Sequence, residues 1–190
     1  MDMEDYQVIS LCREGREEGF RQLLSRYESY IFNLCYRLTC NREDALDLTQ
    51  ETFIKVINGL DGFQINRPFK PWLRQVTVNA CYNFLSRRAP ASVSLEQPLN
   101  EGLTLADLQP VGEDPAQEVE WRDTRRLLWA MIERLPPVYR LVLVLRHQEG
   151  MSYRDIACLT KLPEGTVKTY LFRARQRLRQ GLAEQYGWEG

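Results

Sequence analysis

One stretch near the middle of the chain constrains its folding most. Residues 89–117 contain four prolines, two glycines and neither lysine nor arginine. Proline removes a backbone donor and glycine weakens regular elements, so we expect no packed helix or strand there. Seven carboxylates and no cation fall within residues 91–120. The sequence therefore predicts an N-terminal domain at 1–89, a flexible acidic linker at 90–117 and a C-terminal domain at 118–190.

Hydrophobic periodicity predicts an all-α fold of two small helical domains, because no segment alternates as a strand does. Apolar residues recur at spacings of three and four over residues 20–38, as in an amphipathic helix. A second helix is expected at 41–60 with Asn41 as its cap, and a third at 68–88 with Pro68 in its first turn. In the C-terminal domain, helices are expected at 119–135, 139–147, 153–160 and from 164 onward.

The reactive side chains are too few for most enzymes. The chain has one histidine, and its five cysteines form no CxxC pair. We therefore predict no metal, no cofactor and no enzymatic activity. Cys12, Cys35 and Cys81 lie among apolar residues and are expected to be buried thiols. The N-terminus lacks a signal-peptide pattern and no apolar run reaches about 18 residues, so we expect a cytoplasmic protein without membrane insertion.

The C-terminal domain contains the pattern of a helix-turn-helix. Ser152 and Asp155 form a capping-box-like start for a short helix. Residues 161–163 then supply a turn before a longer helix that begins near Glu164. Its apolar face falls at spacings of four, three and four residues, on Val167, Leu171, Ala174 and Leu178.

The other side of this last helix concentrates donors and positive charge. Residues 121–190 hold 13 Lys and Arg against 7 Asp and Glu. A basic helix after a turn is typical of a recognition helix, whose first residues reach base edges in the major groove. The alternative is a solvated basic surface. The outward positions are Lys168, Phe172, Arg175 and Arg179 on one flank and Thr169, Arg173 and Gln176 on the next.

The helix at 41–60 carries more apolar surface than one core face needs. Carboxylates beside a small apolar strip suit a basic protein surface better than a nucleic acid. The alternative is that Asp44 and Asp47 only stabilise the helix N-terminus. The apolar residues of this strip are Leu46 and Ile54, which share one row of the helix with Gln50, and the acidic residues beside it are Asp44, Asp47 and Glu51.

Residues 61–88 combine a glycine-containing loop, aromatic rings and cations. These are the ingredients for binding unstacked bases beside a phosphate backbone. A row formed by Trp72, Gln75 and Asn79 lies outside the apolar stripe of its helix. Packing and DNA binding are equally open for that row.

Both domains resemble parts of the extracytoplasmic-function (ECF) sigma factors of the sigma-70 family. The C-terminal domain resembles region four through LPPVYRLVLVLRHQEGMSYRDIACLTKLPEGTVKTYLFRARQRLR. The N-terminal domain resembles region two through DALDLTQETFIKV and FKPWLRQVTVNACYNFLSRR. The resemblance covers about residues 5–88 and 118–183. It implies a factor that binds core bacterial RNA polymerase and directs promoter-specific transcription initiation, commonly in a stress response.

The resemblance also implies three sets of contact residues. For the −35 promoter element they are Lys168, Thr169, Phe172, Arg173 and Arg175. For the melted −10 element, whose flipped base the loop at 63–68 would hold, they are Phe63, Asn66, Arg67, Trp72, Arg74, Asn79, Arg87 and Arg88. For polymerase they are Asp44, Leu46, Asp47, Gln50, Glu51 and Ile54, with Phe53 as buried support.

The partners implied by the resemblance are proteins and DNA. They are the clamp helices of the largest polymerase subunit, the flap of the second subunit, promoter DNA as duplex and as melted strand, and an anti-sigma factor. The alternative is a stand-alone helix-turn-helix regulator, which would bind DNA without polymerase. The motif in the N-terminal domain argues against that alternative.

Overall fold

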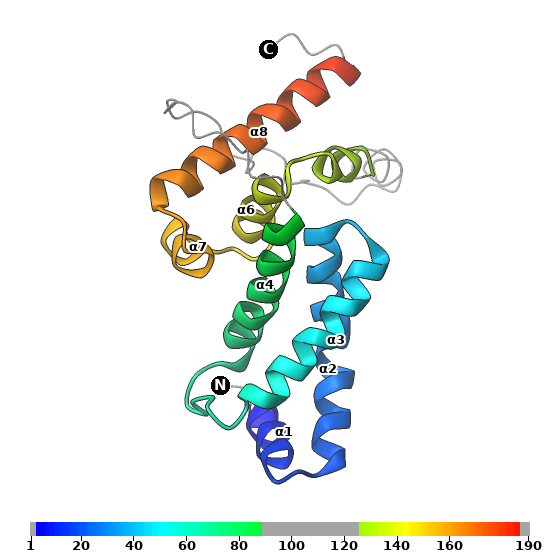
Figure 1. Ribbon diagram of the computed structural model, residues 1–190, viewed down its shortest axis with the longest axis vertical. Helices are drawn as coiled ribbons and strands as arrows, with labels where there is room; N and C mark the ends of the chain where they lie inside the picture. The colour runs from blue at the N-terminus through cyan, green and yellow to red at the C-terminus, as the bar shows by residue number, and fades with distance from the viewer. Residues whose placement is uncertain (1–2, 89–125, 187–190) are drawn as a thin grey trace, which may run out of the picture. The chain divides into compact units, whose positions relative to one another are not determined.

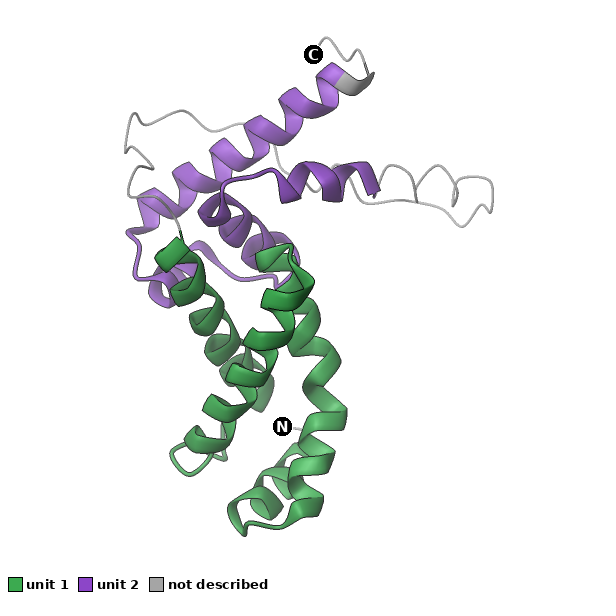
Figure 2. Ribbon diagram, turned by 45° about the vertical axis from the view of Figure 1, so that its right-hand side comes forward, with its two compact units in different colours: residues 1–89 green, residues 90–190 purple. Residues whose placement is uncertain are grey.

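The computed structural model describes residues 3–88 and 126–186, and every regular element within them is a helix (Figure 1). The chain divides into two compact units, Met1–Ala89 and Pro90–Gly190 (Figure 2). The prediction of an all-α fold is confirmed. The linker predicted at 90–117 lies outside the described residues. None of the described helices is long and apolar enough to span a bilayer.

Unit 1 is built around its longest helix, α2, which packs against the other three. The cap predicted for α3 is present, because the Asn41 side chain accepts a hydrogen bond from the Asp44 backbone N–H at 3.0 Å. The helix α1 was not predicted. Its few buried apolar residues, such as Val8 and Ile9, give too weak a periodic signal. The four helices are α1 (Met3–Arg13), α2 (Glu17–Thr39), α3 (Arg42–Gly59) and α4 (Phe69–Arg88).

The core of unit 1 largely follows the predicted helical faces, but Phe20, Val76 and Phe84 on those faces are only half-buried. The helical spacing of the sequence also puts Leu24 and Ile57 on the predicted apolar faces, but they are 41% and 37% exposed. Neighbouring positions on the same helices already fill the interior, and a close-packed core has no room for more side chains. The residues exposed by 1% or less include Leu23, Ile31, Leu34, Cys35 and Leu38 of α2, Leu48 and Val56 of α3, and Leu73 and Cys81 of α4.

Helix α1 crosses the start of α2 at a glycine. A Cβ atom at Gly19 would lie 2.6 Å from the backbone nitrogen of Cys12 and 2.7 Å from the Cβ of Leu11. No side chain fits in that space, so glycine is required for the two backbones to approach. At the opposite end of α1, the Asp5 carboxylate accepts hydrogen bonds from Tyr27 Oη at 2.7 Å and Arg26 Nη1 at 2.8 Å. Helix α1 is thus fixed to α2 at both ends.

The buried cysteines of unit 1 are free thiols, as predicted. The sulfur atoms of Cys35 and Cys81 lie 3.6 Å apart between α2 and α4. The hydrogen bond with Cys35 and burial raise the pKa of the Cys81 thiol well above its usual value. A thiol that stays protonated is a poor nucleophile, so these side chains contribute packing.

Unit 2 places a helix-turn-helix over a buried helix. It contains a helical stretch at 126–133, followed by α6 (Pro137–His147), α7 (Tyr153–Thr160) and α8 (Glu164–Tyr186). Residues 139–145 of α6 are buried and, apart from Arg140, apolar, and the helix packs against both α7 and α8. The predicted capping box is present at Ser152 and Asp155. Lys161, with φ at 58°, then turns the chain through the left-handed region between α7 and α8.

The last residue of α6, His147, lies beside α8. Its Nε2 is 3.2 Å from Nη2 of Arg175. His147 is exposed as a residue, but neighbouring atoms crowd its ring, and this partial desolvation together with the charges of Arg175 and Arg146 lowers its pKa from 6.5 to about 4. The imidazole is therefore neutral at pH 7, and its ring can stay beside Arg175 without charge repulsion.

Two buried threonines of unit 1 provide a matched test of core polarity. The Thr77 hydroxyl donates to Leu73 O at 2.8 Å, whereas that of Thr52 has no partner among the described residues, and both threonines are fully buried. We expect Thr52→Val to raise the free energy of unfolding by about 1 kcal/mol, since it removes an unsatisfied hydroxyl, and Thr77→Val to lower it by about 1 kcal/mol. Native-state hydrogen exchange of unit 1 amides measures both changes. Shifts of the same sign would contradict this account.

The pKa of His147 can be read directly, because the chain has a single histidine. We expect its imidazole resonances to titrate near pH 4 and, in Arg175→Gln, closer to 6.5, while Arg134→Gln leaves the midpoint unchanged. Since the folded pKa lies below the unfolded one, the unfolded chain binds the proton first. Stability should therefore fall as the pH drops from about 6.5 to 4, and His147→Gln should remove that part of the fall. A wild-type midpoint near 6.5 would contradict the claim that partial burial and the two arginines lower the pKa of His147.

Candidate functional site

The outward side of α8 carries the residues predicted for the −35 element. The opposite side is the core face of the helix, where Val167, Leu171, Ala174 and Leu178 are 0–5% exposed, as predicted. Tyr170, which was not predicted for the core, is also buried. The predicted contact residues remain exposed or half-buried on the rest of the helix surface: Lys168, Thr169, Phe172, Arg173 and Arg175.

Two tyrosines, Tyr139 of α6 and Tyr153 of α7, contact cations of α8. Lys168 Nζ lies 5.7 Å from the ring centre of Tyr153, and the guanidinium of Arg146 lies 4.9 Å from the same ring. Lys168 also pairs with Glu164 at 3.2 Å, one turn earlier on α8. Arg173 Nη1 is 3.5 Å from Tyr139 Oη. Cation–ring contacts of this kind orient long side chains while leaving donors available to a ligand.

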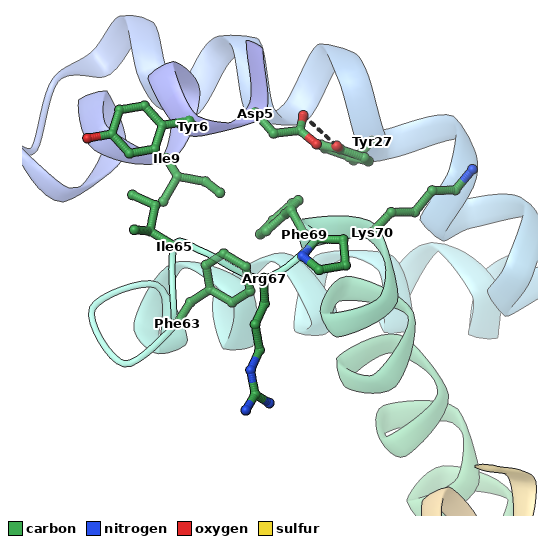
Figure 3. Close-up of a pocket in the computed structure, with 10 residues that line it drawn as sticks. Asp5, Tyr6, Ile9, Tyr27, Phe63, Ile65, Arg67, Phe69 and Lys70 are labelled. Carbon is green, nitrogen blue, oxygen red and sulfur yellow. Dashed lines mark hydrogen bonds between the residues drawn. The ribbon is translucent and has the colours of Figure 1, made fainter. Parts of the chain in front are cut away.

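A cavity of about 260 Å³ lies between α1, α2 and the loop that joins α3 to α4. Figure 3 shows Tyr6 and Ile9 of α1 on one side and Phe63, Ile65 and Phe69 on the other. Arg67 extends from the loop away from α1, and Lys70 lies at the start of α4 (Figure 3). The cavity therefore has aromatic walls with two cations at its rim.

The loop residues predicted to contact the −10 element differ in exposure to solvent. Phe63 was predicted to contact DNA, but it is only 5% exposed. The centre of its ring lies 5.5 Å from the ring centre of Phe69 and 5.0 Å from that of Trp72. Its ring belongs to the core, because the three aromatic rings pack favourably against one another there. Asn66 and Arg67 are exposed on the same loop.

Helix α4 carries the other −10 candidates along its length. Trp72 is half-buried, with its ring 3.1 Å from a Cβ built at Gly59, so packing accounts for at least one side of it. Arg74 is half-buried, whereas Asn79 and Arg87 are exposed. The remaining member of the set is Arg88.

Arg88 connects two of the predicted sets. Its Nη1 lies 2.6 Å from the Asp44 carboxylate, and its guanidinium lies 4.3 Å from the ring centre of Phe84. Asp44 was predicted for polymerase and Arg88 for DNA. In this structure the two charges pair with each other, from α3 to α4.

The outward side of α3 exposes apolar side chains. Leu46 and Ile54 are 43% and 59% exposed, and Ile57, which periodicity had assigned to the core, extends the same strip at 37%. Phe53 is buried at 6%, in agreement with its predicted supporting place. Around the strip, Asp47, Gln50 and Glu51 are exposed and Asp44 is half-buried.

The described residues contain no cluster of three or more His, Cys, Asp or Glu side chains that could hold a metal ion. Residues beside the candidate site that the sequence did not indicate lie on α1, above all Arg13, which donates to three backbone carbonyls between Leu60 and Phe63. No periodic pattern or motif could have indicated these contacts, because the two segments are 47 to 50 positions apart.

Comparisons with solved structures agree with the fold. The chain is similar to CnrH, solved with the cytosolic domain of CnrY, at 22% identity and a TM-score of 0.57, over 95% of this chain and 97% of that one. It is also similar to the sigma factor RpoE of Bartonella quintana, solved with the anti-sigma factor NepR, at 23% identity and a TM-score of 0.55, over 86% and 96%. At these identities the likeness concerns the fold alone.

Comparisons with known sequences identify the family. Residues 23–90 match Sigma-70 region 2, and residues 125–178 match Sigma-70 region 4. The chain is 31% identical to the ECF RNA polymerase sigma factor SigW of Bacillus subtilis, over 97% of this chain and all of that one. It is also 31% identical to the RNA polymerase sigma-H factor of Pseudomonas aeruginosa, over 94% of both. With regions 2 and 4 in order and full-length relatives at this identity, the chain belongs to the ECF sigma factors, a family of transcription initiation factors.

Proposed function

We propose that this protein binds core bacterial RNA polymerase and directs it to promoters through two DNA-binding surfaces. The observation that carries the proposal is the second helix of the helix-turn-helix, α8. Its outward side carries Lys168, Arg173 and Arg175, and its opposite side is buried in the core of unit 2. Unit 2 would bind the −35 element, and unit 1 would bind the melted −10 element and the polymerase. The protein would act in the cytoplasm, where polymerase and chromosome meet.

Binding of the −35 element would use α8 in the major groove. Residues near the start of a recognition helix reach base edges, so Lys168 and Thr169 are placed to read bases, and Lys favours the acceptors of guanine. Phe172 offers apolar contact to a thymine methyl group. Arg173 and Arg175 lie further along the helix, where phosphates are closer, and their contacts would make affinity depend on salt.

Opening of the −10 element would use the loop and α4. Asn66 and Arg67 are exposed beside the cavity of unit 1, whose aromatic walls suit an unstacked base. Trp72, Arg74, Asn79 and Arg87 continue along α4 toward Arg88, where a single strand could follow. No covalent chemistry is involved, because tighter binding of unpaired bases than of duplex supplies the free energy for opening.

Polymerase binding would use the exposed strip of α3. Leu46 and Ile54 give apolar contact, and the carboxylates of Asp47 and Glu51 beside them suit a basic partner surface such as the clamp helices of the largest subunit. Unit 2 would bind the flap of the second subunit. The solved relative RpoE is in complex with the anti-sigma factor NepR. We accordingly propose that an anti-sigma factor controls this protein by covering its polymerase-binding surfaces.

The polymerase-binding proposal is tested by gel filtration with core polymerase that lacks its own sigma subunit. We expect co-elution of the wild-type protein and a roughly tenfold or greater weakening for Leu46→Ala with Ile54→Ala, because two exposed anchors lose their contact area. Leu24→Ala, which removes an equally exposed apolar side chain from α2, is the control and should bind normally. Failure of the folded wild-type protein to co-elute would favour a stand-alone helix-turn-helix regulator.

The DNA-binding proposal is tested by transcription from a promoter library with the reconstituted holoenzyme. We expect Lys168→Ala with Arg173→Ala to lower promoter-directed transcripts roughly a hundredfold while polymerase binding stays intact, since the lost contacts are to DNA. Arg126→Ala with Arg134→Ala removes two cations of unit 2 outside the helix-turn-helix and should leave transcription unchanged. Loss of polymerase binding by the Lys168 and Arg173 variant would refute this division between the two units.

A further inference from the structure

The loop after α3 carries Asn66 and Arg67, and its position matters if, as proposed above, it binds the −10 element. A loop that must receive a base gains affinity when it is already held in its binding position, because less order is then lost on binding. Residues 61–68 have no helical hydrogen bonds to hold them. Two turn hydrogen bonds, from Phe63 N–H to Leu60 O and from Arg67 N–H to Gln64 O, shape the loop locally. Its position relative to the rest of unit 1 must come from contacts with other elements.

Arg13, the last residue of α1, makes those contacts. Its Nε and Nη2 donate to Leu60 O at 3.0 and 2.7 Å. The same Nη2 donates to Phe63 O at 2.5 Å and approaches Asp61 O at 3.4 Å. One guanidinium thus spans the C-terminal end of α3 and the first part of the loop.

The chemistry of this site suits arginine and no other side chain. The last carbonyls of a helix have no partner within it, and they carry partial negative charge. A planar guanidinium with five donors can satisfy several carbonyls at once, whereas a lysine ammonium is a compact charge. Bonds from a charged donor are also stronger than those between neutral groups.

Both sides of the contact are fixed. Helix α1 is held by Asp5 at one end and by the close approach at Gly19 at the other. On the loop, the carbonyl of Phe63 is bound by Arg13 while its ring packs on Phe69 and Trp72. The first part of the loop is therefore anchored by its backbone and by a side chain, and the exposed Asn66 and Arg67 follow within four residues.

We propose that Arg13 is a positioning residue for promoter opening, which holds the base-binding loop through its carbonyls without itself contacting DNA. Helix α1 also lines the cavity beside the loop with Tyr6 and Ile9 (Figure 3). Helix α1 would thereby be part of the −10 site, because it holds the loop and lines one side of the cavity.

The first test is amide hydrogen exchange of the full-length protein. Arg13→Gln and Arg13→Lys should speed exchange across residues 60–67 and leave the core of α2 and α4 unchanged, because the carbonyl contacts are local. Arg16→Gln changes a neighbouring exposed cation and should have no effect. Unchanged exchange in the loop of both Arg13 variants would overturn the proposal, and protection elsewhere shows that the variants are folded.

The second test measures open-complex formation by the holoenzyme on a promoter selected from the library. Both Arg13 variants should open it roughly tenfold less well than wild type, while binding of a −35 duplex is unchanged. Full activity of Arg13→Lys would show that charge alone matters, and would overturn the role of the carbonyl contacts.

The third test asks whether the defect acts through base capture. Single abasic nucleotides are scanned along the melted strand, and one position should weaken opening by the wild-type holoenzyme. The Arg13 variants should lose most of that sensitivity, because a displaced loop no longer holds the base. Retained sensitivity would overturn the proposal. A wild-type holoenzyme that is insensitive at every position would instead refute the proposed role of the loop, and the inference with it.

Discussion

The packing of α2 against α3 and α4 is the interaction on which every candidate site in unit 1 depends. Ile31, Leu34 and Leu38 of α2 are essentially inaccessible to solvent, and burial of each such side chain contributes about 1.5–3 kcal/mol. A core this close-packed has one arrangement, so the rotation of each helix is set by what it buries. The apolar strip on α3 and the polar positions on α4 face outward because the opposite sides of those helices are committed to the core.

Unit 2 separates its surfaces in the same way but with different chemistry. Helix α8 buries its apolar face and retains its cations on the rest of its surface, where Arg173 contacts the neutral hydroxyl of Tyr139, and Lys168 lies by the ring of Tyr153 and pairs with Glu164. Charge that stays available to phosphate suits DNA, whereas the exposed Leu46 and Ile54 of unit 1 suit a protein. The basic surface of unit 2 and the apolar strip of unit 1 therefore differ in residue type, and this difference exists before any partner binds.

The pair between Asp44 and Arg88 links two proposed surfaces of unit 1. The Arg88 side chain is 62% exposed, and an ion pair with one exposed member contributes only about 0–1 kcal/mol. A phosphate or a polymerase residue could replace either partner at little cost. The contact orients Arg88 in the free protein and leaves both residues available, which agrees with their assignment to different partners. The contacts of Arg13 differ in kind, since they satisfy backbone carbonyls that have no helical partner.

The sequence alone determined what depends on residues within about four positions of one another. The caps at Asn41 and Ser152, the all-α class and the buried face of α8 were all predictable, because helical hydrogen bonds and periodicity are local. Only the tertiary structure decided that Phe63 is core, that Leu24 and Ile57 are exposed, and that Arg13 binds the loop after α3. Those outcomes depend on which helices meet and at what rotation, and contacts between residues some 50 positions apart leave no periodic pattern in the chain.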